Sequence, residues 1–122
     1  MLKTMYKALT EYISKAGLPV YQADCVPDDA TFPYITLAID APLNAATEGR
    51  VTLTLWCLGT SAAEDRALLC DSLLAMVPPR GLWLSTANET LLLTPKHPAQ
   101  ALREKTALGM RILWTLRRYP KL

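Results

Sequence analysis

Hydrophobic and polar residues alternate along two stretches of the chain, and this alternation predicts two strands at the centre of a sheet. In residues 49–57, Val51, Leu53 and Leu55 share one face with Cys57, because successive side chains of a strand point to opposite sides. Residues 107–117 alternate in the same way, and one face is fully apolar: Leu108, Met110, Ile112, Trp114 and Leu116. Most strands have about five or six residues, so this last strand is long enough to project beyond the sheet and meet a neighbour.

Apolar residues at helical spacing predict two helices. The first covers residues 2–16 and ends at Gly17, and its apolar stripe consists of Leu2, Met5, Tyr6, Leu9, Ile13 and Ala16. The second begins after Ser61, which forms a capping-box pattern with Glu64, and the Pro78-Pro79 pair ends it. Its apolar face is expected to consist of Ala63, Ala67, Cys70, Leu74 and Val77.

Shorter elements complete a single α+β domain. Strands are predicted at residues 19–23, 33–40, 81–85 and 90–94, and loops without apolar periodicity at residues 24–32 and 41–50. A chain of 122 residues has the length of one domain. We expect a mostly antiparallel, mixed sheet of about five or six strands with both helices packed on it, in the order α-β-β-β-α-β-β-β.

Charge is distributed unevenly along the chain. Residues 1–95 hold six basic and ten acidic residues, net −4, and residues 96–122 hold seven basic residues and one acid, net +6, which together give the overall +2. Such asymmetry suggests an acidic partner or a head-to-tail contact between copies. The basic side chains expected to make that contact are Arg103, Lys105, Arg111 and Arg117, which fall in phase, with Arg118 and Lys121 near the C-terminus.

Two interpretations of this basic segment stay open. In the first, it binds an acidic surface of another subunit or the phosphates of DNA without reading a specific sequence. In the second, it is a solvated strand face whose charges discourage sheet-edge aggregation. The acidic loop with Asp24, Asp28 and Asp29 is a possible complement in a ring, although ordinary turn chemistry is the favoured explanation for it.

Trp56 belongs with these candidate interface residues. It points away from Val51, Leu53 and Leu55 on its strand, because neighbouring residues of a strand face opposite sides. We therefore expect it to pack on the second face of the sheet or on a neighbouring subunit, where large aromatic side chains commonly anchor contacts.

The inventory of reactive residues indicates a protein without catalysis. His97 is the single histidine, no nucleophile or carboxylate stands beside it, and the sequence contains neither GxSxG, HExxH nor a phosphate-binding loop. A zinc site formed by His97 with Cys25, Cys57 and Cys70 lacks the paired spacing that zinc ligands usually have. We therefore expect no catalytic residues, no metal, no cofactor and no small-molecule substrate, and we expect Cys57 and Cys70 to be buried free thiols.

Hydrophobicity along the chain predicts no membrane segment. No window reaches the ~18 apolar residues that a spanning helix needs. In the first predicted helix, Lys3, Lys7 and Glu11 interrupt any continuous signal-peptide core. The sequence therefore predicts a protein made in the cytoplasm of its host, with no membrane contact.

The order of elements resembles the tail-terminator and head–tail joining proteins of long-tailed bacteriophages. The residues that carry the resemblance are the V-x-L-x-L-W strand at 51–56, the Gly-Thr-Ser junction at 59–61, the following helix rich in Ala, Glu, Asp and Leu, and PYITL at 33–37. The resemblance implies a ring, often hexameric, in the virion at the upper end of the tail tube. The partners it implies are further copies of the chain, the tail tube protein and the head connector.

Three alternatives to this interpretation remain open. A head–tail adaptor or minor capsid protein belongs to the same structural class, and only the position in the virion separates it from a terminator. A small nucleic-acid-binding module would use the basic C-terminal segment. A small enzyme or metabolite-binding domain is the third class, and a thermal shift with a ligand would favour it.

Overall fold

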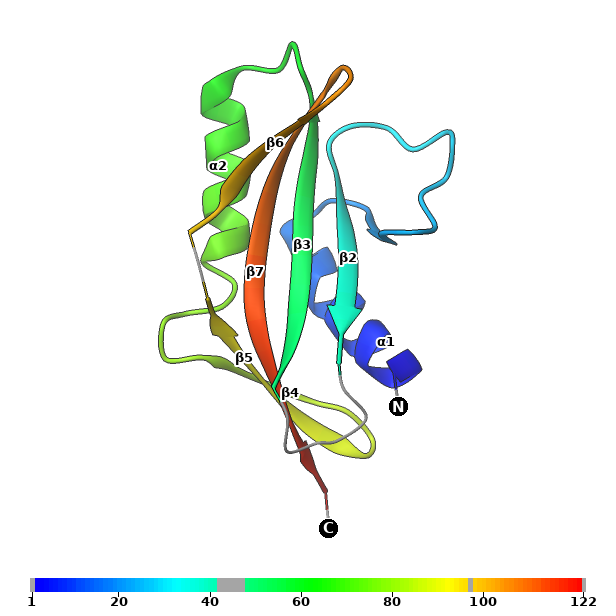
Figure 1. Cartoon of the computed structure of the whole chain (residues 1–122), viewed down its shortest axis with the longest axis vertical. Coiled ribbons are helices and arrows are strands. Elements are labelled where there is room, and N and C mark those ends of the chain that lie inside the picture. The colour runs from blue at the N-terminus through cyan, green and yellow to red at the C-terminus, as the bar shows by residue number, and fades with distance from the viewer. Residues whose placement is uncertain (1, 42–47, 97, 122) are drawn as a thin grey trace.

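A seven-stranded mixed sheet with helices against one of its faces forms the fold (Figure 1). The structure is a computed structural model, and it describes residues 2–41, 48–96 and 98–121. The elements, in chain order, are α1 (Leu2–Ile13), the 3-10 helix η1 (Ser14–Ala16), β1 (Val20–Gln22), β2 (Tyr34–Asp40), β3 (Gly49–Leu58), α2 (Ala63–Leu74), β4 (Leu82–Ser85), β5 (Glu89–Pro95), β6 (Gln100–Glu104) and β7 (Ala107–Pro120).

The longest strand, β7, organises the sheet. The strand order is β1-β2-β3-β7-β5-β4, and β6 also pairs with β7. One edge of β7 pairs with β3, and the other edge pairs first with β6 and then with β5. β1 and β2 are parallel, and the other pairs are antiparallel. The predicted α+β class and mostly antiparallel, mixed sheet are therefore confirmed.

The core lies between the sheet and the two α-helices. In register, Leu37 pairs with Leu53 and Leu53 with Ile112, so the apolar residues of three strands share one face. Both helices lie behind the sheet in Figure 1 and pack on this face. They contribute Met5, Leu9 and Ile13 from α1 and Cys70 and Leu73 from α2.

Backbone groups at the β2 edge of the sheet are satisfied by neighbouring elements. β1 pairs with only three residues of β2. Beyond it, the backbone N–H of Ile39 donates a hydrogen bond to the Tyr6 hydroxyl of α1 at 3.1 Å. The helix therefore closes a strand edge that would otherwise be open to pairing with another chain. At the end of the same helical segment, Gly17 has φ 86°, a left-handed conformation that glycine adopts readily.

The second helix differs from its prediction at its start. The N-cap residue is Ala62, whose side chain makes no capping hydrogen bond, and the Ser61 hydroxyl instead donates to the Leu58 carbonyl at 2.6 Å. The capping box expected for Ser61 and Glu64 is therefore wrong. Ser61 lies one residue before the N-cap position, and its side chain instead closes the turn that follows β3.

The buried face and the end of α2 also differ from their predictions. α2 ends at Leu74, before the Pro78-Pro79 pair, and Ala63, Ala67 and Leu74 are exposed. The buried face is rotated toward Leu73, with Cys70 and the following Val77. Burying these larger side chains removes more apolar surface from water than burying two alanines would.

β6 was not predicted from the sequence, whereas the other strands lie close to their predicted positions. Four of its five residues are exposed, so it lacks the alternation that marks a half-buried strand. Its pairing with β7 is visible only in three dimensions.

Candidate interaction surface

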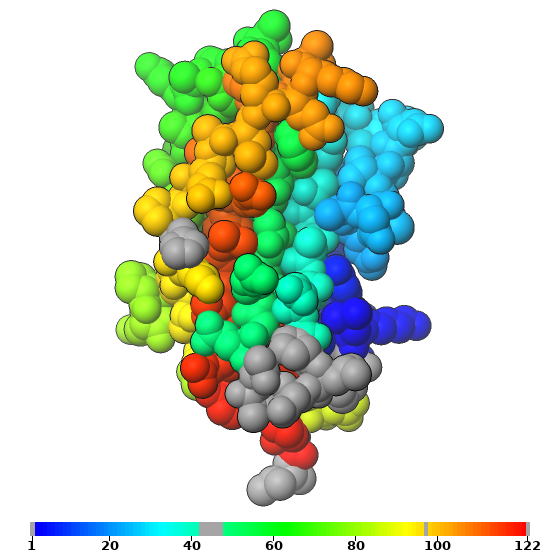
Figure 2. All heavy atoms as spheres, in the orientation of Figure 1, coloured from blue at the N-terminus to red at the C-terminus, as the bar shows by residue number. Residues whose placement is uncertain are grey.

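One face of the sheet carries no helix, and Figure 2 shows the molecule from the side of this uncovered face. Trp56 lies on this face. Its Nε1 donates to the Thr36 hydroxyl at 3.1 Å. Its ring covers Gly109, where a Cβ atom would lie only 2.9 Å from Trp56 Cζ3. The expectation that Trp56 packs on the second face of the sheet therefore agrees with its position.

The predicted basic face is divided between two elements. Arg103 lies in β6 and Lys105 in the turn that follows, with φ 52°, whereas Arg111 and Arg117 lie in β7. Arg103 pairs in register with Leu108, so the two lie on the same face of the sheet. Leu108 and Arg111 are three residues apart in β7, so Arg103 and Arg111 lie on opposite faces. The expectation of one in-phase basic face is wrong, because a hairpin turn separates the two halves of the segment.

Arg118 is not part of the surface. It is 6% exposed, and its Nε donates to the Glu89 carboxylate at 2.8 Å, in an ion pair whose acid is 3% exposed. Arg118 occupies the same phase as Ile112, Trp114 and Leu116, so the alternation of β7 directs it to the core side. The expectation that Arg118 is an interface residue is therefore corrected.

The remaining basic candidates at this end of β7 are exposed. Arg117 forms an ion pair with Glu48 at 3.2 Å, with more than a third of each side chain exposed. Lys121 Nζ donates to the Thr86 carbonyl at 2.6 Å. Half-exposed ion pairs of this kind contribute little to stability, so these cations stay accessible to a partner.

The acidic loop lies between β1 and β2. Asp24, Asp28 and Asp29 are all exposed, and in the described part of the chain none of them forms an ion pair. Asp24 accepts a hydrogen bond from the exposed Cys25 thiol and raises its pKa. Within one copy, no ion pair of the described residues joins this loop to the basic candidates, although Lys105 lies across a hollow from it.

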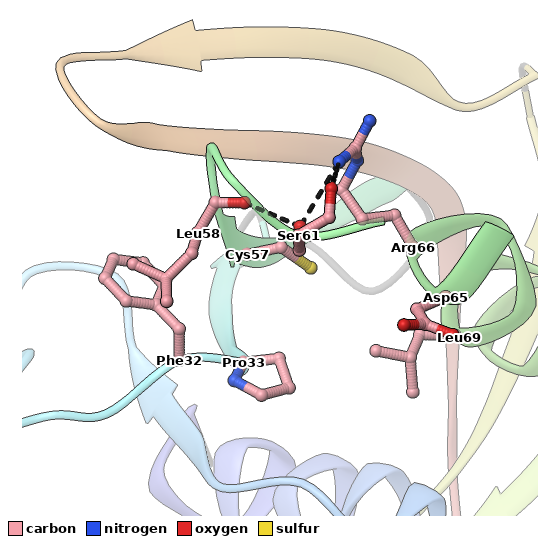
Figure 3. Close-up of a pocket in the computed structure, with 8 residues that line it drawn as sticks. All are labelled: Phe32, Pro33, Cys57, Leu58, Ser61, Asp65, Arg66 and Leu69. Carbon is pink, nitrogen blue, oxygen red and sulfur yellow. Dashed lines mark hydrogen bonds between the residues drawn. The ribbon is translucent and has the colours of Figure 1, made fainter. Parts of the chain in front are cut away.

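Two hollows flank Phe32, which precedes β2. The larger has a volume of about 460 Å³ and lies between the acidic loop and the β6–β7 turn; it is lined by Phe32, Tyr34, Trp56, Glu104 and Lys105, among others. The smaller, of about 200 Å³, lies between Phe32 and α2 (Figure 3).

Polar side chains at the rim of the smaller hollow bond one another, and its thiol is neutral. Arg66 donates to the carbonyl and hydroxyl of Ser61 at its rim (Figure 3). Burial raises the pKa of the Cys57 thiol that lines it, so this cysteine is a neutral thiol near pH 7 rather than a nucleophilic thiolate. Cys57 and Cys70 are buried and free, as predicted.

Among residues 2–41, 48–96 and 98–121, no group of three or more His, Cys, Asp or Glu residues is arranged to hold a metal ion. His97, which the zinc and catalytic hypotheses require, lies outside the described residues, as do residues 42–47 of the predicted loop. Within the described part, no helix has the length and apolar character needed to cross a membrane.

Comparison with known proteins finds no matching family model and no matching curated sequence. The surfaces of the chain offer exposed charge and exposed aromatic side chains, both of which suit binding to another macromolecule.

Proposed function

We propose that this protein is a virion assembly protein of a long-tailed bacteriophage, of the tail-terminator or head–tail joining type. It forms a ring of copies, such as a hexamer, at the upper end of the tail tube, stops further polymerisation of the tube protein and presents a surface to the head connector. It acts by binding alone, in the host cytoplasm during assembly and then in the virion.

The observation that carries the proposal is the pair of large aromatic side chains left exposed on the uncovered side of the sheet. Trp83 is 58% exposed and Tyr119 is 43% exposed, and their ring centroids lie 5.6 Å apart. The largest exposed apolar patch of a soluble protein is often an interaction site, and aromatic residues are enriched in the buried centres of interfaces. The resemblance in element order supplies the kind of assembly, and the aromatic pair supports contact between macromolecules.

The test is the molar mass in solution, measured by light scattering after size exclusion at low and at high salt. A closed oligomer several times the 13.5 kDa chain mass is expected, and a lower mass in high salt would indicate that charges contribute. A monomer at every protein concentration, under both conditions, would contradict ring formation in solution.

A charge-reversed variant tests the electrostatic part of this proposal. Arg103, Lys105, Arg111 and Arg117 are replaced together by glutamate, and we expect a lower oligomer mass than for the wild type. Normal assembly of this variant would show that pairing of these charges with an acidic surface is wrong, while leaving the ring itself in place.

A nucleic-acid-binding module is the second candidate, and the exposed Arg103 and Lys105 at the β6–β7 turn favour it. The buried pair of Arg118 with Glu89 removes one cation from that surface. Retention on duplex DNA that falls with a slope of about −0.9 per neutralised phosphate in log–log salt plots would support it.

Location in the purified virion separates a terminator from an adaptor or minor capsid protein.

A further inference from the structure

We propose that neighbouring subunits join head to tail, with the outer surface of α2 in one copy packed on the exposed aromatic pair of the next. This inference rests on the proposed assembly function and names the two surfaces that build the ring. The first surface, called here the α2 arc, consists of Leu74, Ala67, Asp71, Glu64 and Leu68. The second, called the aromatic patch, consists of Trp83, Leu92, Arg117, Tyr119 and Lys121.

The α2 arc is an apolar and acidic strip that faces solvent. At about 100° per residue, Leu74, Ala67, Asp71, Glu64 and Leu68 follow one another over about 120° of the helix surface. Leu74 lies at the end next to the buried Cys70, Leu68 lies at the other end, and the two acids lie between the two leucines. Leu68 is 67% exposed and Leu74 is 36% exposed. A surface helix usually turns charged and polar residues to solvent, whereas this helix keeps two leucines there.

The aromatic patch lies at the end of the sheet that is formed by β4, β5 and the C-terminal end of β7. Trp83 of β4 pairs in register with Leu92 of β5, which pairs with Arg117 of β7. These three residues therefore share one face, together with Tyr119, whose ring contacts Trp83. Arg117 and Lys121 bring positive charge to the rim, and Glu48 neutralises part of the charge of Arg117.

The two surfaces complement each other in composition and in charge. Each presents two large exposed apolar side chains, and together they hold four of the exposed large hydrophobics of the described residues: Leu68, Leu74, Trp83 and Tyr119. The α2 arc carries Glu64 and Asp71, whereas the aromatic patch carries Arg117 and Lys121. Exposed apolar side chains next to complementary charges on the two surfaces suit a specific contact between copies.

A second copy is required for this contact. α2 lies toward the end of the molecule that carries the β6–β7 turn, while β4 and the C-terminal end of β7 lie toward the other end (Figure 1). A contact between two different surfaces of the same chain is heterologous, and repeating it gives either a closed ring or an open filament. The proposed contact therefore provides the head-to-tail geometry that a ring needs.

The experiment uses one disrupting substitution in each surface and measures molar mass by light scattering. Leu68→Lys places a charge in the α2 arc, and Trp83→Thr removes the aromatic anchor while keeping a residue that suits a strand. Leu2→Lys is the matched control, because Leu2 is 48% exposed and belongs to neither surface. Circular dichroism and thermal unfolding check that each variant is folded.

We expect the wild type and Leu2→Lys to form the same closed oligomer and each interface variant to run as a 13.5 kDa monomer. An equimolar mixture of Leu68→Lys and Trp83→Thr is the decisive sample. Each variant keeps one intact surface, so the mixture should form a heterodimer of about twice the monomer mass and nothing larger.

Each other outcome overturns a specific part of the proposed contact or of the assembly proposal. Variants that keep the wild-type mass would reject this contact and leave the ring proposal standing. Monomeric variants whose mixture stays monomeric would reject the pairing of the α2 arc with the aromatic patch. Dissociation of Leu2→Lys as well would show that the loss is not specific to the two surfaces. A wild type that is monomeric at every concentration would overturn the assembly proposal together with this contact.

Discussion

At the scale of single residues, the stability of the protein should be sensitive to substitution of either partner in the buried pair of Glu89 and Arg118. Each residue is less than a tenth exposed, and the two are joined at 2.8 Å. Removing one partner of such a pair leaves a charge in a poorly solvated place, whereas replacing both partners by apolar groups is often neutral. The pair therefore matters less for its own strength than for the cost of separating it.

We predict that Arg118→Met lowers the free energy of unfolding by about 3–5 kcal/mol, because it leaves the Glu89 carboxylate without its cation. The double variant Glu89→Leu with Arg118→Met should recover most of that loss. Arg117→Met is the matched control, since the exposed pair with Glu48 should contribute less than about 1 kcal/mol. Urea unfolding in a monomeric background such as Leu68→Lys measures all three, so that loss of subunit contacts does not contribute, and equal losses at the two arginines would contradict the prediction.

The three cysteines should react with alkylating reagents at different rates. Cys25 is exposed, and Cys57 and Cys70 are buried, so one thiol per native chain should be modified quickly. The hydrogen bond to Asp24 and its charge raise the pKa of Cys25, which lowers its thiolate fraction at a given pH. Asp24→Asn should therefore speed alkylation of Cys25 near pH 7–8, as followed by mass spectrometry, and an unchanged rate would contradict the role of Asp24.

At the scale of elements, the start of α2 leaves room for improvement. Its N-cap is Ala62, which has no side-chain acceptor for the free N–H groups of the first turn. Ala62→Ser should therefore raise the free energy of unfolding by about 0.5–1 kcal/mol. Ser61→Ala should not cost a full helix cap, because Ser61 bonds the Leu58 carbonyl instead. Thermal unfolding of both variants tests whether Ala62 is the N-cap. An Ala62→Ser variant that is no more stable than the wild type would contradict this.

Period and burial explain which elements the sequence predicts well. β3 and β7 alternate cleanly, and α1 has a single wide apolar stripe, so their positions follow from pattern alone. α2 has apolar residues on several sides, and its pattern does not decide which side the sheet will bury. β6 is exposed along most of its length, so only its partner strand identifies it.

The same reasoning applies to the candidate surface. The exposure of Arg117 and the burial of Arg118 both follow from the alternation of β7, so the two arginines can be separated by their phase in the sequence. The exposed aromatic pair could not be predicted in this way. Trp83 and Tyr119 are far apart in the chain, and they meet only because β5 lies between their strands.

At the scale of the whole molecule, both helices share one core with the sheet. The buried residues of α1 and α2 belong to the same cluster as Trp114 of β7. We predict that a monomeric variant such as Leu68→Lys unfolds in one cooperative transition, as small single domains usually do. Urea curves from far-ultraviolet circular dichroism and from tryptophan fluorescence should coincide, and separate midpoints would show that the helices and the sheet unfold independently.

The place of β7 in the sheet has a consequence for how the protein is made. β7 pairs with β3, β5 and β6, yet it is the last of the seven strands to leave the ribosome. The earlier strands have no central partner until then, and such non-local pairing makes folding wait for loop closure. A chain whose synthesis stops before β7 lacks the middle of its sheet, so unfinished translation products should fail to fold and should be degraded.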